Sequence, residues 1–130
     1  MISITTKSPY ALKALTELAL AGEAAPVPIG ELAKRREIPV QFLEQLFATL
    51  RRAGVLSSQR GVKGGYSFAR PADEVTVLEI VELLDGPLGR DGEGIFGDAA
   101  QAARTVLAGA TIAELAERER SAGAPSMYYI

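Results

Sequence analysis

The chain has 130 residues, of which 48% are hydrophobic and 23% are charged, and its formal net charge is −2. This length and apolar content predict one folded domain with at most a small appendage, and they exclude a disordered chain. Cysteine and histidine are absent, which excludes disulfides, Cys-held iron–sulfur clusters and ordinary zinc sites, and removes the commonest general base. No apolar run approaches the roughly 18–20 residues that span a bilayer, and no signal peptide is recognised, so we expect a cytoplasmic protein without a membrane partner.

The first two predicted elements are helices joined by an extended connector. Ser8 and Pro9 have the residue types of an N-cap and a first helical position, and apolar residues then recur at helical spacing until Gly22. Residues 25–28 are predicted to be extended, because residues before proline avoid the helical region. A second helix is expected over residues 29–36, with Lys34, Arg35 and Arg36 on its outer side.

Residues 39–70 are the most informative part of the chain. Pro39 marks the start of a third helix, and Gly54 its end. One apolar stripe of this helix is formed by Leu43, Leu46, Phe47 and Leu50. Residues 55–59 and 66–69 are strand-like, with a turn between them. The fold class predicted from these elements is mainly α with a small β wing, a winged helix-turn-helix followed by a C-terminal dimerisation helix.

The third helix and the hairpin carry the candidate DNA-binding residues. Gln and Glu side chains can bond base edges, and an outward arc near the start of the helix supplies Gln41, Glu44 and Gln45. Arg60 and Lys63 supply positive charge for phosphates or a narrow minor groove, and the glycines beside them allow close approach. The whole candidate set is Gln41, Phe42, Glu44, Gln45, Arg51, Arg52, Arg60, Gly61, Lys63 and Gly64.

Each of these patterns also has a plainer interpretation. The polar arc is compatible with an ordinary solvated helix face, and the glycine-rich tip with a plain β-turn. Lys34–Arg36 and Arg51–Arg52 are further candidate phosphate contacts, although basic residues at helix ends are common.

The charges are distributed unevenly along the chain. Residues 1–70 carry ten Lys or Arg and five acidic residues, a net charge of +5, whereas residues 71–130 carry four Arg and eleven acidic residues, a net charge of −7. A basic half can concentrate near DNA while an acidic half stays in solvent. The alternative is that the acidic half only improves solubility.

The C-terminal half is predicted to contain three more helices. Capping boxes at Thr76 and Thr111 open two of them, which end near residues 84 and 120. Between them, residues 89–94 have the composition of a flexible linker, and a helix follows over about residues 95–108. This helix gains little stability alone, so we expect it to pack against a second subunit. Its candidate dimerisation residues are Phe96, Ala99, Ala103, Val106 and Leu107.

The predicted domains are a winged helix-turn-helix DNA-binding domain over residues 1–86, and a linker, dimerisation helix and tail over residues 87–130. Paired carboxylates such as Asp73 and Glu74, or Glu79 and Glu82, lie at presumed surface or helix-start positions. Without histidine or an apolar pocket around them, catalysis is not expected. The sequence therefore predicts no catalytic residue, no metal ligand and no cofactor.

Four segments carry a family resemblance. They are ITTKSPYAL at 4–12, FLEQLFATLRRAGVL at 42–56, SQRGVKGGY at 58–66 and VLEIVELL at 77–84. With these segments the chain resembles the bacterial Rrf-two-type regulators, the family of IscR, NsrR, RirA and CymR. The resemblance implies a homodimeric winged-helix repressor or activator that binds double-stranded DNA and dimerises through the helix at about residues 95–108.

The departures from the family pattern are informative. Cluster-binding members carry three cysteines in the loop before the dimerisation helix, and the corresponding residues 86–94 include none. The chain is therefore more similar to the cluster-free, CymR-like members. Ser8 and Pro9 replace the family's usual Gly-Arg, which removes a phosphate contact from the first helix.

The C-terminus provides one more expectation. CymR-type proteins act with cysteine synthase, an enzyme whose active site captures partner tails ending in isoleucine, so Tyr129 and Ile130 are candidates for such a contact. The alternative is that this tail folds back onto its own dimer.

The predicted function is a DNA-binding transcriptional repressor that acts as a homodimer without an iron–sulfur cluster, with a suggested role in cysteine or sulfur metabolism. The alternative is a winged-helix protein-interaction module with weak or no DNA binding, and the overall negative charge favours it slightly.

Overall fold

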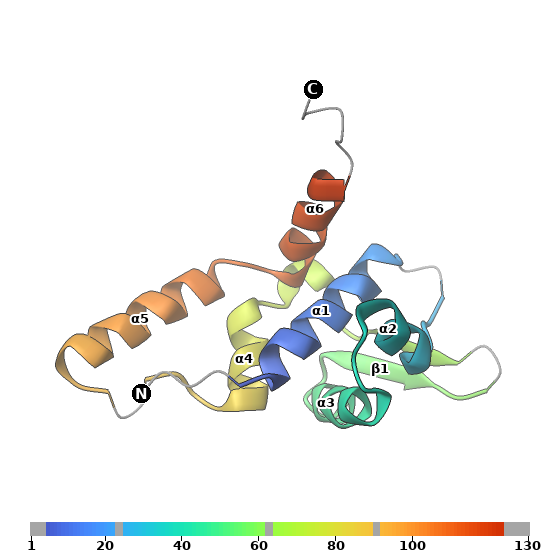
Figure 1. The fold of residues 1–130 in the computed structure, drawn as a ribbon, viewed down its shortest axis with the longest axis horizontal. Helices are drawn as coiled ribbons and strands as arrows, with labels where there is room; N and C mark the ends of the chain where they lie inside the picture. The colour runs from blue at the N-terminus through green and yellow to red at the C-terminus, as the bar shows by residue number, and fades with distance from the viewer. Residues whose placement is uncertain (1–4, 23–24, 62–63, 90–91, 124–130) are drawn as a thin grey trace.

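The computed structural model of the chain describes residues 5–22, 25–61, 64–89 and 92–123. Three helices come first, α1 (Lys7–Leu20), α2 (Ile29–Arg36) and α3 (Val40–Arg52), and a hairpin of β1 (Leu56–Gln59) and β2 (Gly65–Phe68) follows. The chain continues through a 3-10 turn, η1 (Ala72–Glu74), to α4 (Val77–Asp85), α5 (Gly94–Ala108) and α6 (Ile112–Gly123). Helices α1 to α3 and the hairpin lie together, whereas α5 extends away from them (Figure 1). The predicted winged helix-turn-helix is confirmed.

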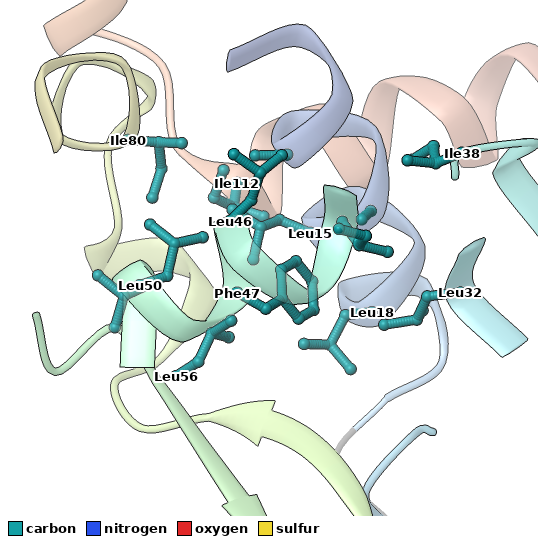
Figure 2. Packing of buried hydrophobic residues seen from close by; sticks show 14 of the residues in the cluster. Leu15, Leu18, Leu32, Ile38, Leu46, Phe47, Leu50, Leu56, Ile80 and Ile112 are labelled. Carbon is teal, nitrogen blue, oxygen red and sulfur yellow. The ribbon is translucent and has the colours of Figure 1, made fainter. Parts of the chain in front are cut away.

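The hydrophobic core lies between α1 and α3. Leu15 of α1 and Phe47 and Leu50 of α3 are fully buried, and Ile80 of α4 and Ile112 of α6 join them (Figure 2). The predicted apolar stripe of α3 is buried at all four positions. Burying one such side chain contributes about 1.5–3 kcal/mol, so this stripe holds α3 firmly with its other side outward.

Helix α6 is part of the same core. It packs against α1, and Ile112 and Ala116 are 0% and 1% exposed. Its start is tied to the start of α4, because Ile112 N donates to the Val75 carbonyl at 2.9 Å and Val77 N donates to the Ala110 carbonyl at 2.9 Å. The division at residue 86 remains a prediction, and α6 shares the core of the helices that precede it.

A third segment of the chain pairs with the β hairpin, and the sequence did not indicate this pairing. β1 and β2 pair antiparallel, with Leu56 opposite Phe68. Val27 in the connector exchanges two backbone hydrogen bonds with Tyr66 of β2, at 2.9 and 2.8 Å. The predicted extended conformation of the connector therefore serves to pair it with the hairpin.

The predicted start of α1 is wrong. The helix begins at Lys7, its N-cap position is Thr6, and no side chain caps it. Ser8 is fully buried, and its hydroxyl donates to the carboxylate of Asp85 at the end of α4. The half-buried carboxylate of Asp85 thus engages the buried hydroxyl that the sequence suggested as a cap.

None of the described helices has the length and apolar character that crossing a membrane requires.

Candidate nucleic-acid interface

Helix α3 presents a polar face to solvent. Gln41, Glu44 and Gln45 are exposed, and they lie away from the buried stripe of the same helix. The helix is amphipathic over 13 residues, about 20 Å of rise, which is a suitable length for a major groove. The structure therefore brings the three predicted base-reading side chains onto one accessible surface.

Phe42 has a different environment from its neighbours. It is half-buried, and its ring packs edge-on against Tyr10 of α1, with the centroids 5.6 Å apart and the planes at 82°. Edge-to-face packing is the favoured geometry for an aromatic pair. Phe42 thus attaches the first turn of α3 to α1, and its contact with DNA remains a prediction.

Arg51 and Arg52 lie exposed in the last turn of α3, where cations interact favourably with the helix dipole. Arg51 donates to the Ser58 hydroxyl of β1 at 3.4 Å, and Arg52 donates to the Thr49 hydroxyl at 3.3 Å. Over the described parts of the chain, neither guanidinium is paired with a carboxylate. Both charges remain available to phosphates.

The hairpin tip requires its glycines. Gly61 has a φ of +109°, and its carbonyl accepts a hydrogen bond from Gly64 N at 2.9 Å. A Cβ at Gly64 would lie 2.3 Å from the Gln59 carbonyl oxygen, so no side chain fits there. Arg60 is exposed beside this turn, whereas Lys63 lies outside the described residues.

Arg35 and Arg36, which are also candidate phosphate contacts, form ion pairs within the protein, and their role at phosphates remains a prediction. Arg36 donates to Glu17 at 2.9 Å and to Glu119 at 2.8 Å, and its side chain is only 18% exposed. Burial works to lower the pKa of Arg36, but hydrogen bonds and charges from Glu119 and Glu17 outweigh it and raise the pKa above its usual value. Arg35 pairs with Glu17 at 3.2 Å and with Glu31. These two charges connect α2 to α1 and α6.

Helix α5 divides its predicted dimerisation residues between two faces. Phe96 and Val106 are 72% and 69% exposed, and Ala99 is also exposed. Ala103 and Leu107 are half-buried and pack on the cluster of Val77, Val81 and Leu88. One face of the helix therefore rests on α4, and another leaves large apolar side chains uncovered, Ile95 included at 73% exposure.

The family model Rrf2, described as an iron-dependent transcriptional regulator, matches residues 4–95. The HTH-type transcriptional regulator IscR of Cereibacter sphaeroides is 44% identical over 86 residues, which cover 65% of this chain and 56% of that protein. IscR of Escherichia coli K12 is 40% identical over 82 residues, which cover 63% and 51%. The chain thus spans little more than half the length of these curated relatives.

Solved structures agree over most of the chain. CymR, the global cysteine regulator of B. subtilis, is 31% identical with a TM-score of 0.82, covering 91% of this chain and 98% of its own. IscR of T. potens is 30% identical with a TM-score of 0.85, covering 99% and 97%. These relatives are regulators and not enzymes, as predicted.

An iron–sulfur cluster held by cysteine does not fit this chain, because it contains no Cys and no His. Within the described ranges, no group of three or more acidic side chains is placed to hold a metal ion either. The resemblance carried by the four sequence segments is confirmed by the family match and by both solved folds. The chain belongs to the Rrf2 family of transcriptional regulators.

Proposed function

We propose that this protein is a homodimeric, sequence-specific DNA-binding repressor that works without an iron–sulfur cluster. The observation that carries the proposal is the exposed polar arc of α3, flanked by Arg51, Arg52 and Arg60. A polar helix face between cations has the two parts that DNA recognition needs, base readout and phosphate anchoring.

Base selection is assigned to Gln41, Glu44 and Gln45. A glutamine amide can bond both the N6 and N7 positions of adenine, and a glutamate can accept from the amino group of cytosine. A carboxylate near phosphates is unfavourable unless a base donates to it, so Glu44 favours a site that offers cytosine. The buried stripe of α3 keeps these side chains in a defined orientation.

Phosphate anchoring is assigned to Arg51, Arg52, Arg60 and Lys63, with Gly61 and Gly64 allowing the backbone to come close. The excess positive charge of residues 1–70 supports this assignment. Since Arg35 and Arg36 are neutralised within the protein, the cations beside α3 and on the wing carry most of the attraction.

Dimerisation is assigned to α5. Large apolar side chains in water are unfavourable, and Ile95, Phe96 and Val106 are all more than two-thirds exposed. A second copy of α5 would cover them, with Ala99 allowing close approach and Ala103 and Leu107 supporting the helix from below. Two-fold symmetry then separates the half-sites by about one helical turn, roughly 10 bp, or a multiple.

A gel-shift titration with the duplex upstream of the protein's own gene tests the proposal. We expect binding that resists an excess of random duplex, with one dimer bound per site. Absence of any shift at low salt would overturn the proposal and support a protein-interaction module.

A role in cysteine metabolism is a second part of the proposal. It is supported by the likeness to CymR, which is named as a cysteine regulator. Tyr129 and Ile130, which lie outside the described residues, would bind cysteine synthase. Capture of purified cysteine synthase by the full chain, but not by a form lacking Ile130, is the expected result, and equal capture would dispose of this contact.

A further inference from the structure

We propose that a recess on α1, lined by Thr5, Thr6, Pro9, Tyr10 and Lys13, holds a backbone phosphate of the duplex that α3 reads. This inference rests on the proposed function, because it adds a contact to the same DNA. We refer to these five residues as the α1 recess.

The charge of the recess comes from Lys13. Its Nζ atom lies 5.7 Å from the centroid of the Tyr10 ring, within the range of a cation–π interaction. Five arginines, at positions 35, 36, 70, 104 and 120, are paired with carboxylates, whereas across the described ranges Lys13 has no such partner. Its ammonium is therefore held over a ring and keeps an uncompensated charge.

Two aromatic rings connect this ammonium to α3. Tyr10, below Lys13, packs against Phe42 with the ring centroids 5.6 Å apart. Phe42 lies in the first turn of α3, between Gln41 and Glu44, and α1 lies against α3 (Figure 1). Since the sugar–phosphate backbone borders the groove that receives a recognition helix, a strand beside the start of α3 passes the α1 recess.

The recess has room and donors for a phosphate. Its volume is about 460 Å³, and Thr6 and Lys13 are exposed. The acidic group in contact with the recess is Asp85, and its oxygens already accept hydrogen bonds from Thr5, at 2.5 Å, and from Ser8. The donors left to a ligand are the hydroxyls of Thr6 and Tyr10 and the Lys13 ammonium, a set that matches a phosphodiester oxygen.

The test measures how DNA affinity depends on salt for the full-length protein and three variants. Fluorescence anisotropy would follow binding to the duplex upstream of its gene and to a random duplex. Lys13→Gln should reduce the slope of log K against log salt by about 0.9 unit per subunit on both duplexes. The ratio of wild-type to variant affinity should therefore fall about 3.5-fold per subunit between about 50 and 200 mM salt. Lys13→Arg should retain the wild-type slope.

Arg118→Gln is the matched control, because it removes the same charge from the exposed surface of α6, away from the recess. It should leave the slope unchanged. Lys13 is exposed and its contact with the Tyr10 ring contributes little, so Lys13→Gln should unfold within a few degrees of the wild type and stay folded at the assay temperature, and a lost slope then reports binding.

Phosphate-ethylation interference identifies the contact directly. One ethylated phosphate per half-site should block the wild type and be tolerated by Lys13→Gln. If the wild type binds its site and Lys13→Gln gives the same slope and the same interference pattern, the phosphate contact in the α1 recess is overturned and the proposed function still stands. A wild type that binds neither duplex at low salt would overturn both.

Discussion

Gly65 shows how one residue determines the shape of the wing. Its φ is +151°, and a Cβ there would lie 2.3 Å from the Val27 carbonyl carbon. The missing side chain lets the connector approach close enough for Val27 and Tyr66 to exchange their hydrogen bonds. Tyr66 also packs edge-on against Phe47, with centroids 5.1 Å apart, so the wing and α3 meet at this point.

Gly65→Ala should therefore destabilise the protein by about 1–3 kcal/mol, because backbone atoms must separate and a strained φ must be adopted. Urea denaturation at constant pH measures the change. Gly30→Ala is the control, since nothing lies within 4 Å of that added Cβ, and a better helix former there should be neutral or mildly stabilising. Equal stability of the two variants would contradict the prediction.

At the proposed base-reading surface, Gln45→Ala should relax base preference at one position of the half-site, at a cost of about 1–3 kcal/mol for the preferred base. Arg60→Ala should instead weaken binding to all sequences alike and make the salt slope shallower by about one unit per subunit. Selection of binding sites from a random pool, followed by affinity measurements, distinguishes the two effects. Equal losses on specific and random duplex for Gln45→Ala would falsify its assignment.

Among the elements, α1, α2 and α6 are connected by shared ion pairs. Glu17 of α1 accepts from both Arg35 and Arg36 of α2, and Arg36 reaches on to Glu119 of α6. Asp85 connects the end of α4 to the start of α1 in a similar way, through Thr5 and Ser8. Both connections join elements that are far apart in the chain, so they depend on the completed core.

Arg36→Met should lower the free energy of unfolding by about 1–3 kcal/mol, because charge-assisted hydrogen bonds of a mostly buried side chain are lost. Arg120→Met is the matched control. It removes a pair with Glu117 in which both side chains are more than half exposed, and such pairs contribute about 0–1 kcal/mol. Chemical denaturation of both variants provides the comparison, and similar losses would argue against a special role for Arg36.

The pH dependence of the free energy of unfolding should include a contribution from the Asp85 carboxylate. Burial works to raise its pKa, but hydrogen bonds from Ser8 and Thr5 outweigh it and hold the pKa below the usual 3.8. A folded-state pKa below the unfolded one means that the carboxylate stabilises the fold above about pH 4 and loses this effect as the pH falls through the folded value. Stability curves between about pH 2 and 6 should therefore be flatter for Asp85→Asn than for the wild type. Parallel curves would refute the assignment.

At the scale of the whole molecule, α5 differs from the core helices in how its apolar side chains are covered. Helices α1, α3, α4 and α6 bury their apolar stripes within one subunit, whereas α5 rests on α4 by only one face (Figure 1). In the proposed dimer, a second subunit covers the exposed apolar side chains of α5. Such an arrangement would place the two copies of α3 opposite each other across the two-fold axis.

Phe96→Glu should shift the protein from dimer to monomer, because a charge would have to be desolvated where a ring was covered. A central aromatic anchor contributes about 2 kcal/mol or more, so the dimer dissociation constant should rise at least about 30-fold. Sedimentation velocity over a concentration series measures it. Ser121→Glu adds the same charge on α6 and should leave the mass unchanged, and a Phe96→Glu protein that remains dimeric would exclude α5 as the interface.

Local signals were sufficient for several predictions. The observed bounds of α2 agree with the predicted residues 29–36, and the buried stripe of α3 followed from helical periodicity. Thr76 caps α4 as expected, accepting from Glu79 N at 3.1 Å. These features depend on interactions within a few residues along the chain, which sequence patterns record directly. The complete absence of Cys and His was also decisive by itself, since it removes the ligands of a cysteine-held cluster.

Only the tertiary structure decided which partner each polar side chain takes. Ser8 and Asp85 are 77 residues apart, and Arg36 and Glu119 are 83 apart, so no local pattern could pair them. The same holds for the contact between Tyr10 and Phe42, which joins α1 and α3. Sequence by itself determined the elements and the chemical types on the α3 surface. The folded core determined which charges are consumed inside the protein and which remain for DNA, because contacts between distant segments exist only after the chain has closed.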